Sequence, residues 1–339
     1  MEDGDCAKWG VSSEQEWQLV QQLTDEIELE AGPLAAEWDK YVMRRFLRAR
    51  KMNILAAKQM FLEQLEWRKG VQVDTVLTDF HFDERPAFSQ FYPEGFYGTD
   101  REGRPVYVQQ PGKIDLDQLW KVTTQERCIR YHLQQQERYW RIIAPSCSVT
   151  DPRGRKHEQS LVLIDMEGVG VSTMTGEVRR LMGLIMQIDQ DYFPELMWKA
   201  VIVNAPMSFR AIWALIKHFM DACTQAKIEV LGTNFKEELL RLVSPDQLMA
   251  CYGGSNPAPL SAEPGPWQDP AVLAALEQQR QQRLAECKRP SSMTFPPVPG
   301  GARAAAVAGG GDAAPAVVEG AAAHGGDEVA GAPVAAALT

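Results

Sequence analysis

The pattern of apolar and polar positions predicts short strands alternating with long helices in the middle of the chain. Three apolar runs have the character of buried strands, residues 106–109, 160–166 and 200–206. Apolar residues at helical spacing predict helices at 123–143, ending before Pro145, and at 176–191. Strands separated by long helices indicate a mainly parallel sheet with helical crossovers, and therefore an α/β fold.

Residues 200–231 are predicted to form a strand, an apolar helix over 208–220 and a second short strand over 226–231. Only three residues of the helix are charged or basic, and they do not form a continuous polar face. A helix in the outer layer of a protein normally keeps one polar face, so this one is either a deeply buried crossover or a helix that contacts lipid. Periodicity alone leaves both interpretations open.

The ends of the chain differ from its middle. Further helices are predicted at 14–30, 38–50 and 56–69, with Gly70 as the stop of the third, and at 235–243. The last fifty residues are dominated by Ala, Gly, Pro and Val, and such a segment cannot bury enough apolar surface to offset its ordering entropy. We expect five parts along the chain. They are an N-terminal extension over 1–37, a small all-helical lobe over 38–90, an α/β domain over 91–255, a C-terminal segment over 256–289 and a disordered tail over 290–339.

Composition narrows the function classes. The 339 residues are 45% hydrophobic and 24% charged, as in ordinary globular proteins, and the net charge is −10. Such an acidic chain is a poor general ligand for nucleic acid and gains little from anionic membranes, so anion binding requires a local basic cluster. Six dispersed cysteines favour reduced thiols and a cytoplasmic protein. We expect no signal peptide and no membrane span, hence a soluble protein whose membrane contact is peripheral.

Motifs for catalysis and cofactors are incomplete. Residues 168–173 follow a strand as a dinucleotide fingerprint would, but Thr173 replaces the third glycine. Residues 98–105 have phosphate-loop spacing, but Arg104 and Pro105 replace the required Lys and Ser/Thr. The histidines lack zinc-ligand spacing, and no nucleophile elbow is present. We therefore expect a protein that is not an enzyme and that binds neither a metal nor a cofactor. A nucleotide-dependent oxidoreductase is kept as an alternative.

A basic cluster is the strongest local charge feature. Six basic residues occur within residues 40–51: Lys40, Arg44, Arg45, Arg48, Arg50 and Lys51. Arg44, Arg48 and Lys51 recur at helical spacing and share a face that could meet a phosphate. The alternative is a solvated helix face, as most charge runs are.

Eight segments together, in their order and spacing, resemble the CRAL-TRIO lipid-binding family, specifically the phosphatidylinositol/phosphatidylcholine transfer proteins of fungi and plants. The segments are RFLRARK at 45–51, WRK at 67–69, DREGRPVY at 100–107, YFPE at 192–195, VNAP at 203–206, KIEVLG at 227–232, YGG at 252–254 and GPWQDP at 265–270. The resemblance covers about residues 38–270.

The resemblance implies a helical lobe followed by a mixed sheet flanked by helices, which enclose a deep apolar pocket under a mobile gating helix. The gate would lie within residues 208–220 and contain Phe209, Ile212, Trp213, Ile216 and Phe219. An apolar gate is physically reasonable, because it covers acyl chains when closed and inserts at a bilayer surface when open.

The resemblance also implies a phosphatidylinositol site. Arg50 and Lys51 match the basic pair near the phosphate, and Glu195 matches the carboxylate that accepts from inositol hydroxyls. Thr224 and Lys227 match the hydroxyl and the ammonium of the phosphate region. This chemistry is suitable, since a polyol needs acceptors and a phosphodiester needs donors and positive charge.

The choline-lipid site is implied less completely. Tyr107 and Ser160 match family positions, but Val162 stands where fungal members carry a second hydroxyl, a loss worth roughly 1 kcal/mol or more. Leu196 stands where they carry an arginine, and Asp221-Ala222 replaces Asp-Pro at the end of the gate. Phosphatidylinositol is therefore the favoured ligand. A sterol, a tocopherol-like molecule or another lipid is the alternative.

In such a protein the phospholipid is the ligand, and no cofactor is implied. The resemblance implies a monomer that exchanges lipid between membranes such as the Golgi, and that presents inositol lipid to a kinase.

Overall fold

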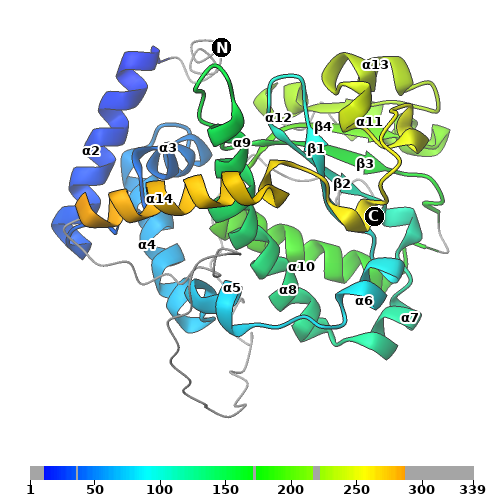
Figure 1. Cartoon of the computed structure of the whole chain (residues 1–339), viewed down its shortest axis with the longest axis horizontal. Coiled ribbons are helices and arrows are strands. Elements are labelled where there is room, and N and C mark those ends of the chain that lie inside the picture. Colours follow the sequence, from blue (N-terminus) through cyan, green and yellow to red (C-terminus); the bar gives the residue numbers. More distant parts are fainter. Residues whose placement is uncertain (1–10, 36, 171–172, 217–221, 287–339) are drawn as a thin grey trace.

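The chain folds as a mixed sheet flanked by helices, with a helical lobe on one side (Figure 1). The structure is a computed structural model, and it describes residues 11–35, 37–170, 173–216 and 222–286. The expected tail over 290–339 and the gate residue Phe219 lie outside these residues. Within the described part, no helix combines the length and apolar character needed to cross a membrane.

The sheet confirms the predicted α/β class. Its strands, in spatial order, are β1 (Glu94–Thr99), β2 (Pro105–Gln109), β3 (Ser160–Asp165), β4 (Met197–Val203) and β5 (Ile228–Val230). The β1–β2 pair is antiparallel, as the turn-rich segment between the two strands requires, and every other pair is parallel. Parallel strands need long crossovers, and the intervening helices supply them.

The two faces of the sheet are covered unequally. On the first face, Leu161, Leu163 and Val201 are at most 1% exposed and pack with residues of α13 (Lys236–Leu242). On the second face, Val162 and Ile164 are only partly buried although β3 is the central strand. A central strand that keeps partial exposure on one face borders incompletely filled space.

The helical lobe has its own core. It contains α2 (Ser13–Ala31), α3 (Lys40–Ala49) and α4 (Ile54–Gly70). Val20, Leu23 and Ile27 of α2 are buried with α3 and α4, so the first helix contributes to the same core rather than lying apart. Polar side chains cap each start: Ser12 forms a capping box, and Asp39 and Asn53 accept from first-turn amides.

Helix α4 ends at Gly70, where the sequence predicts its stop, but Gly70 is not the left-handed residue that a glycine stop implies. The next residue, Val71, donates its N–H to Trp67 3.0 Å away. The left-handed residue that reverses the chain is Gln72, with φ of 53°. Glycine is only the preferred residue for that conformation, so the sequence places the turn two residues early.

The remaining helices surround the sheet and connect it to the lobe. They are α5 (Val76–Asp79), α6 (Arg85–Phe91), α7 (Leu116–Val122), α8 (Gln125–Arg138), α9 (Ala144–Thr150), α10 (Gly176–Tyr192), α11 (Met207–Ile216), α12 (Ala222–Lys227) and α14 (Pro270–Glu286). In Figure 1, α14 runs across α9 toward the helical lobe, and it packs on α9.

Two predicted boundaries are wrong for identifiable reasons. The helix expected to end before Pro145 continues through a π-helical turn at Tyr139–Ile143 into α9. A π turn leaves one carbonyl without its α-helical donor, so a proline directly afterwards is tolerated. The strand expected at 226–231 is shorter, because the Ala- and Gln-containing residues of α12 are good helix formers and only Ile228–Val230 are extended.

The glycine motif after β3 forms a tight turn. Gly168 has φ of 80°, and a Cβ at Gly112 would collide with the backbone of this turn. The glycines are therefore explained by a left-handed conformation and a close approach of two backbones.

Candidate functional site

Two of the predicted headgroup residues meet. The Lys227 ammonium lies 2.8 Å from a Glu195 carboxylate oxygen, and the two side chains are 18% and 20% exposed. Glu195 follows α10 in a left-handed conformation, with φ of 60°, and Lys227 is the last residue of α12. Backbone strain of this kind costs about 1–3 kcal/mol and is often found at functional sites.

The turn that carries Glu195 is fixed by the helical lobe. The Trp67 ring of α4 stacks on Tyr192 with centroids 3.8 Å apart, and the Gln64 amide donates to the Tyr192 carbonyl at 2.6 Å. Two segments of the family pattern, 67–69 and 192–195, are thus packed against each other. This explains why an aromatic residue is needed in each.

Arg50 and Lys51 lie at the end of α3, close to the same turn. Lys51 adopts φ of 50°. Burial raises the pKa of Asp191, and the charge of Arg50 offsets part of that rise. Among the described residues, no hydrogen bond or ion pair joins this pair to Glu195 or Lys227. The side chain of Thr224 lies outside the description, so its role stays a prediction.

Of the three residues that helical spacing puts on one basic face, Lys51 is exposed, whereas Arg44 and Arg48 are largely covered. Arg48 is 9% exposed and donates to Glu16 of α2 at 2.9 Å, and Arg44 pairs with Glu158 at 3.0 Å. Helical spacing correctly puts Arg44 and Arg48 on one face, but their part of that face is covered by the rest of the protein. The alternative of a solvated helix face is therefore wrong for these two residues.

The predicted choline-lipid residues share the second face of the sheet. Tyr107 is directly opposite Val162 in the parallel register, and Ser160 precedes Val162 by two residues. The Ser160 hydroxyl donates to the Leu196 carbonyl at 3.3 Å, and the Tyr107 ring packs on Phe96 with centroids 4.8 Å apart. The missing hydroxyl at position 162 therefore lies at the centre of this group.

A partly buried carboxylate beside these residues escaped the sequence analysis. Glu94 begins β1 opposite Gln109, and its side chain hydrogen-bonds with Tyr107 and Gln109. Burial raises the pKa of Glu94, and it also raises that of Tyr107 well above its ordinary value. Strand alternation from Phe96 could have placed Glu94 on the second face, but its burial depends on helices distant in sequence.

Helix α11 covers the second face of the sheet near β4 and β5. Phe209 and Trp213 are 5% and 8% exposed and pack with Met166, Ile202 and Ala205. The side chains of Ile212 and Ile216 are outside the description, as is Phe219. For Phe209 and Trp213 the choice between burial and lipid contact is settled as burial in this conformation.

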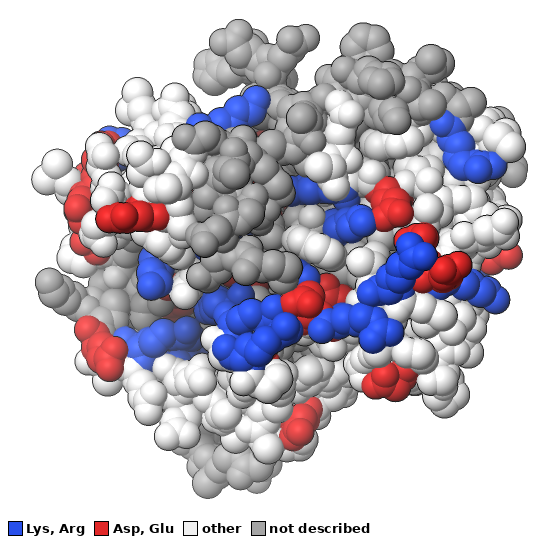
Figure 2. Space-filling view, turned by 90° about the horizontal axis from the view of Figure 1, so that it is seen from above, with Lys and Arg blue, Asp and Glu red and all other residues white. Residues whose placement is uncertain are grey.

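Two cavities in the described part of the chain are lined mainly by polar and charged residues. One of about 140 Å³ has Glu195 in its wall together with arginines of α3, and one of about 70 Å³ lies between α3 and the π turn. Figure 2 shows basic side chains in a band across one face, with acidic side chains beside them. The apolar pocket that the family resemblance implies stays a prediction.

Comparison with known proteins identifies the class. The model of the CRAL/TRIO domain matches residues 90–254, which include the sheet, α11 and the Glu195–Lys227 pair. A relative in Schizosaccharomyces pombe, "Sec14 cytosolic factor", is 38% identical over 246 residues, which are 72% of this chain and 85% of that protein. The chain belongs to the CRAL/TRIO family.

Within that family the relatives are of the Sec14 type. "Phosphatidylinositol/phosphatidylcholine transfer protein SFH7" of Arabidopsis thaliana is 39% identical over 241 residues, which are 69% of this chain but 44% of that protein. The chain thus spans less than half the length of this relative. The crystal structure of Sfh5 has the same fold, with a TM-score of 0.53 at 19% identity over 79% of this chain and 98% of that one.

Proposed function

We propose that the protein binds phosphatidylinositol and transfers it between membranes, with phosphatidylcholine as a weaker second ligand. The observation that carries the proposal is the Glu195–Lys227 pair, a partly buried acceptor and donor 2.8 Å apart. One headgroup could reach both, with inositol hydroxyls donating to the carboxylate and the phosphodiester accepting from the ammonium. Relatives named as transfer proteins for these two lipids support the choice.

The second face of the sheet supplies the rest of the argument. Val162 and Ile164 are partly exposed in the middle of the sheet, which suits a wall that acyl chains complete. Helix α11 would act as the gate, with Phe209 and Trp213 buried in the closed position and turned to the bilayer in the open one. The closed and open positions of α11 need differ in free energy by only a few kcal/mol.

The missing hydroxyl at Val162 favours the inositol lipid over the choline lipid. The Tyr107 side chain is already hydrogen-bonded to Glu94, and Ser160 to the backbone, so a choline-lipid headgroup finds few free donors here. The apolar character of Val162 and Leu196 supports the alternative ligand class, a sterol or tocopherol-like molecule.

We further propose that the protein works by exchange alone, without covalent chemistry. It would act as a monomer in the cytoplasm, in peripheral contact with membranes such as the Golgi, and present inositol lipid to a kinase there. The names of the relatives describe transfer.

The test is transfer of labelled phosphatidylinositol between vesicles by Lys227→Ala. We expect transfer to fall at least about tenfold, which corresponds to roughly 1.4 kcal/mol of binding free energy. Lys199→Ala is the matched control, because Lys199 on β4 is also partly buried and pairs with a carboxylate, that of Glu229 at 2.6 Å. Unchanged transfer by a folded Lys227→Ala protein would refute the proposed site.

A further inference from the structure

The cavity of about 140 Å³ is strongly basic. It lies between α3, the β1–β2 turn and residues 155–159, and six basic side chains line it: Arg44, Arg45, Arg48, Arg104, Arg155 and Lys156. Its wall contains two carboxylates, those of Glu158 and Glu195. The lining therefore carries an excess of positive charge in a chain whose net charge is −10.

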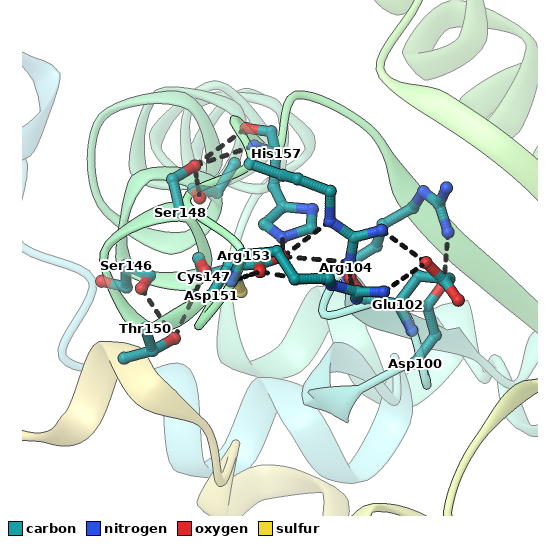
Figure 3. A network of polar contacts seen from close by, with 12 residues as sticks. Asp100, Glu102, Arg104, Ser146, Cys147, Ser148, Thr150, Asp151, Arg153 and His157 are labelled. Atoms are coloured by element: carbon teal, nitrogen blue, oxygen red, sulfur yellow. Dashed lines mark hydrogen bonds and ion pairs between the residues drawn. The ribbon is translucent and has the colours of Figure 1, made fainter. Parts of the chain in front are cut away.

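Most of these cations are held in place by carboxylates behind them. Arg104 pairs with Asp100 at 3.0 Å (Figure 3), and Arg155 pairs with Asp151 at 3.0 Å. Asp151 is in turn hydrogen-bonded to the His157 ring at 2.7 Å. The network fixes one wall of the cavity before any ligand arrives, which is the arrangement expected of a preorganised binding site.

Arg45 is the exception. It is 7% exposed and lines both cavities, and within the described part of the chain its guanidinium has no hydrogen bond and no ion pair. Its nearest aromatic contact is the Trp140 ring, 5.6 Å away. The nearby Glu158 carboxylate is bonded to Arg44, whose buried Nε also has no partner among the described residues.

A guanidinium that is mostly buried and has no counter-ion within ion-pair distance is unfavourable, because its lost hydration is only partly compensated. Burial lowers the pKa of Arg45, which reflects the same cost. An anion bound in the cavity would remove this cost of desolvation. The volume of about 140 Å³ is roughly ten times the 10–15 Å³ that a single water needs, which leaves room for a group of phosphate size.

We propose that this cavity binds a phosphate group, with Arg45 as its central ligand and Arg44, Arg104 and Lys156 around it. A phosphate accepts charge-assisted hydrogen bonds from several guanidinium groups at once. The inference goes beyond phosphatidylinositol transfer and does not depend on it. The phosphate belongs either to a soluble phosphate compound or to a phosphorylated inositol lipid, whose ring could approach past Glu195.

The experiment is calorimetric titration of the full chain with inorganic phosphate. We expect Arg45→Met to raise the Kd for phosphate at least about tenfold, while its melting temperature without phosphate is unchanged or higher. Lys156→Ala, at the cavity rim, should weaken binding as well and remains informative if Arg45→Met does not fold. Lys40→Met, on the same helix but outside the cavity, is the control and should bind as the parent does.

A second arm distinguishes the two sources of phosphate. Phosphatidylcholine vesicles containing either phosphatidylinositol or a phosphatidylinositol monophosphate are offered to the parent and to both cavity variants. If the variants extract less phosphatidylinositol monophosphate but as much phosphatidylinositol as the parent, the phosphate belongs to a lipid. If the variants are defective only in binding inorganic phosphate, the phosphate belongs to a soluble compound. Equal binding by all proteins in both arms, or no binding by any, would overturn the proposal. Normal phosphate binding with no phosphatidylinositol transfer would refute the proposed function alone.

Discussion

At the scale of single residues, the protein places many charges where water cannot reach them, and pairs nearly all of those described. Arg68 of α4 and Glu137 of α8 form a two-pronged pair, at 2.7 and 2.9 Å, with side chains 1% and 0% exposed. Burial alone would raise the pKa of Glu137, but Arg141 and Arg68 outweigh it and hold that pKa below its ordinary value. The pair connects the helical lobe to the helices of the sheet domain.

Glu137→Gln should destabilise the fold by about 3–5 kcal/mol in urea unfolding, because it removes the fully buried carboxylate that the buried arginines Arg68 and Arg141 share. Glu66→Gln is the control and should cost less than about 1 kcal/mol, since its pair with Lys69 is exposed. The folded pKa of Glu137 is depressed, so its contribution is present above the unfolded pKa and is lost as pH falls through the folded pKa. The difference between parent and variant should therefore narrow in acid. A cost equal to that of the control at neutral pH would contradict this role.

At the scale of elements, the sequence predicts what periodicity controls. The helices α4 and α10 and the apolar strand β3 appear close to their expected positions, because local patterning and apolar burial agree there. The next strand, β4, covers Met197–Val203 where 200–206 is expected, since the apolar pattern does not mark where a strand begins. The sequence does not predict the π turn before Pro145 or the helix at residues 222–227, because the local sequence there is compatible with more than one secondary structure. Tertiary packing decides between them.

The same distinction applies to the site. The pairing of Glu195 with Lys227 could be expected from family motifs, although the residues are far apart in sequence. Helical spacing places Arg44 and Arg48 on one face but says nothing of what covers it, and the covering residues, Glu16 and Glu158, come from distant segments. Glu94 could not be singled out from the sequence, because an isolated acidic residue at the start of a strand is usually exposed.

Helix α11 should open more readily than the sheet on which it packs. A gate must unfold or swing locally at a free energy below that of global unfolding, so its amides exchange through smaller openings. We expect hydrogen exchange in α11 to be at least about tenfold faster than in β4, and faster than in α13 on the first face. Mass spectrometry of peptic peptides measures this directly. Protection of α11 equal to that of β4 would contradict the gate.

At the scale of the whole molecule, the C-terminal segment holds the sheet and its flanking helices together. Glu263, whose side chain is 3% exposed, pairs with Arg85 of α6 at 2.6 Å and with Arg138 of α8 at 2.7 Å. Trp267 then donates its ring N–H to the Glu263 carbonyl at 2.9 Å and packs beside Phe96 of β1. From there α14 continues along α9 (Figure 1). The elements around the second face of the sheet are thus joined through one carboxylate.

Charge is distributed to match this arrangement. The chain as a whole is acidic, which disfavours general attraction to anionic surfaces, while six of its basic side chains line one cavity that Glu195 also borders. A protein built this way would select a phosphate-bearing ligand by local fit rather than by long-range attraction. The apolar part of that ligand would lie under α11.

The most direct test of the central claim is the identity of the lipid that the protein carries. The full chain is purified after incubation with mixed-lipid vesicles, extracted with organic solvent and examined by mass spectrometry, with Lys227→Ala and Lys199→Ala treated in parallel. We predict phosphatidylinositol in the parent and in Lys199→Ala, and its marked loss from Lys227→Ala. Recovery of only a sterol or a tocopherol-like lipid, with no phosphatidylinositol, would contradict the account.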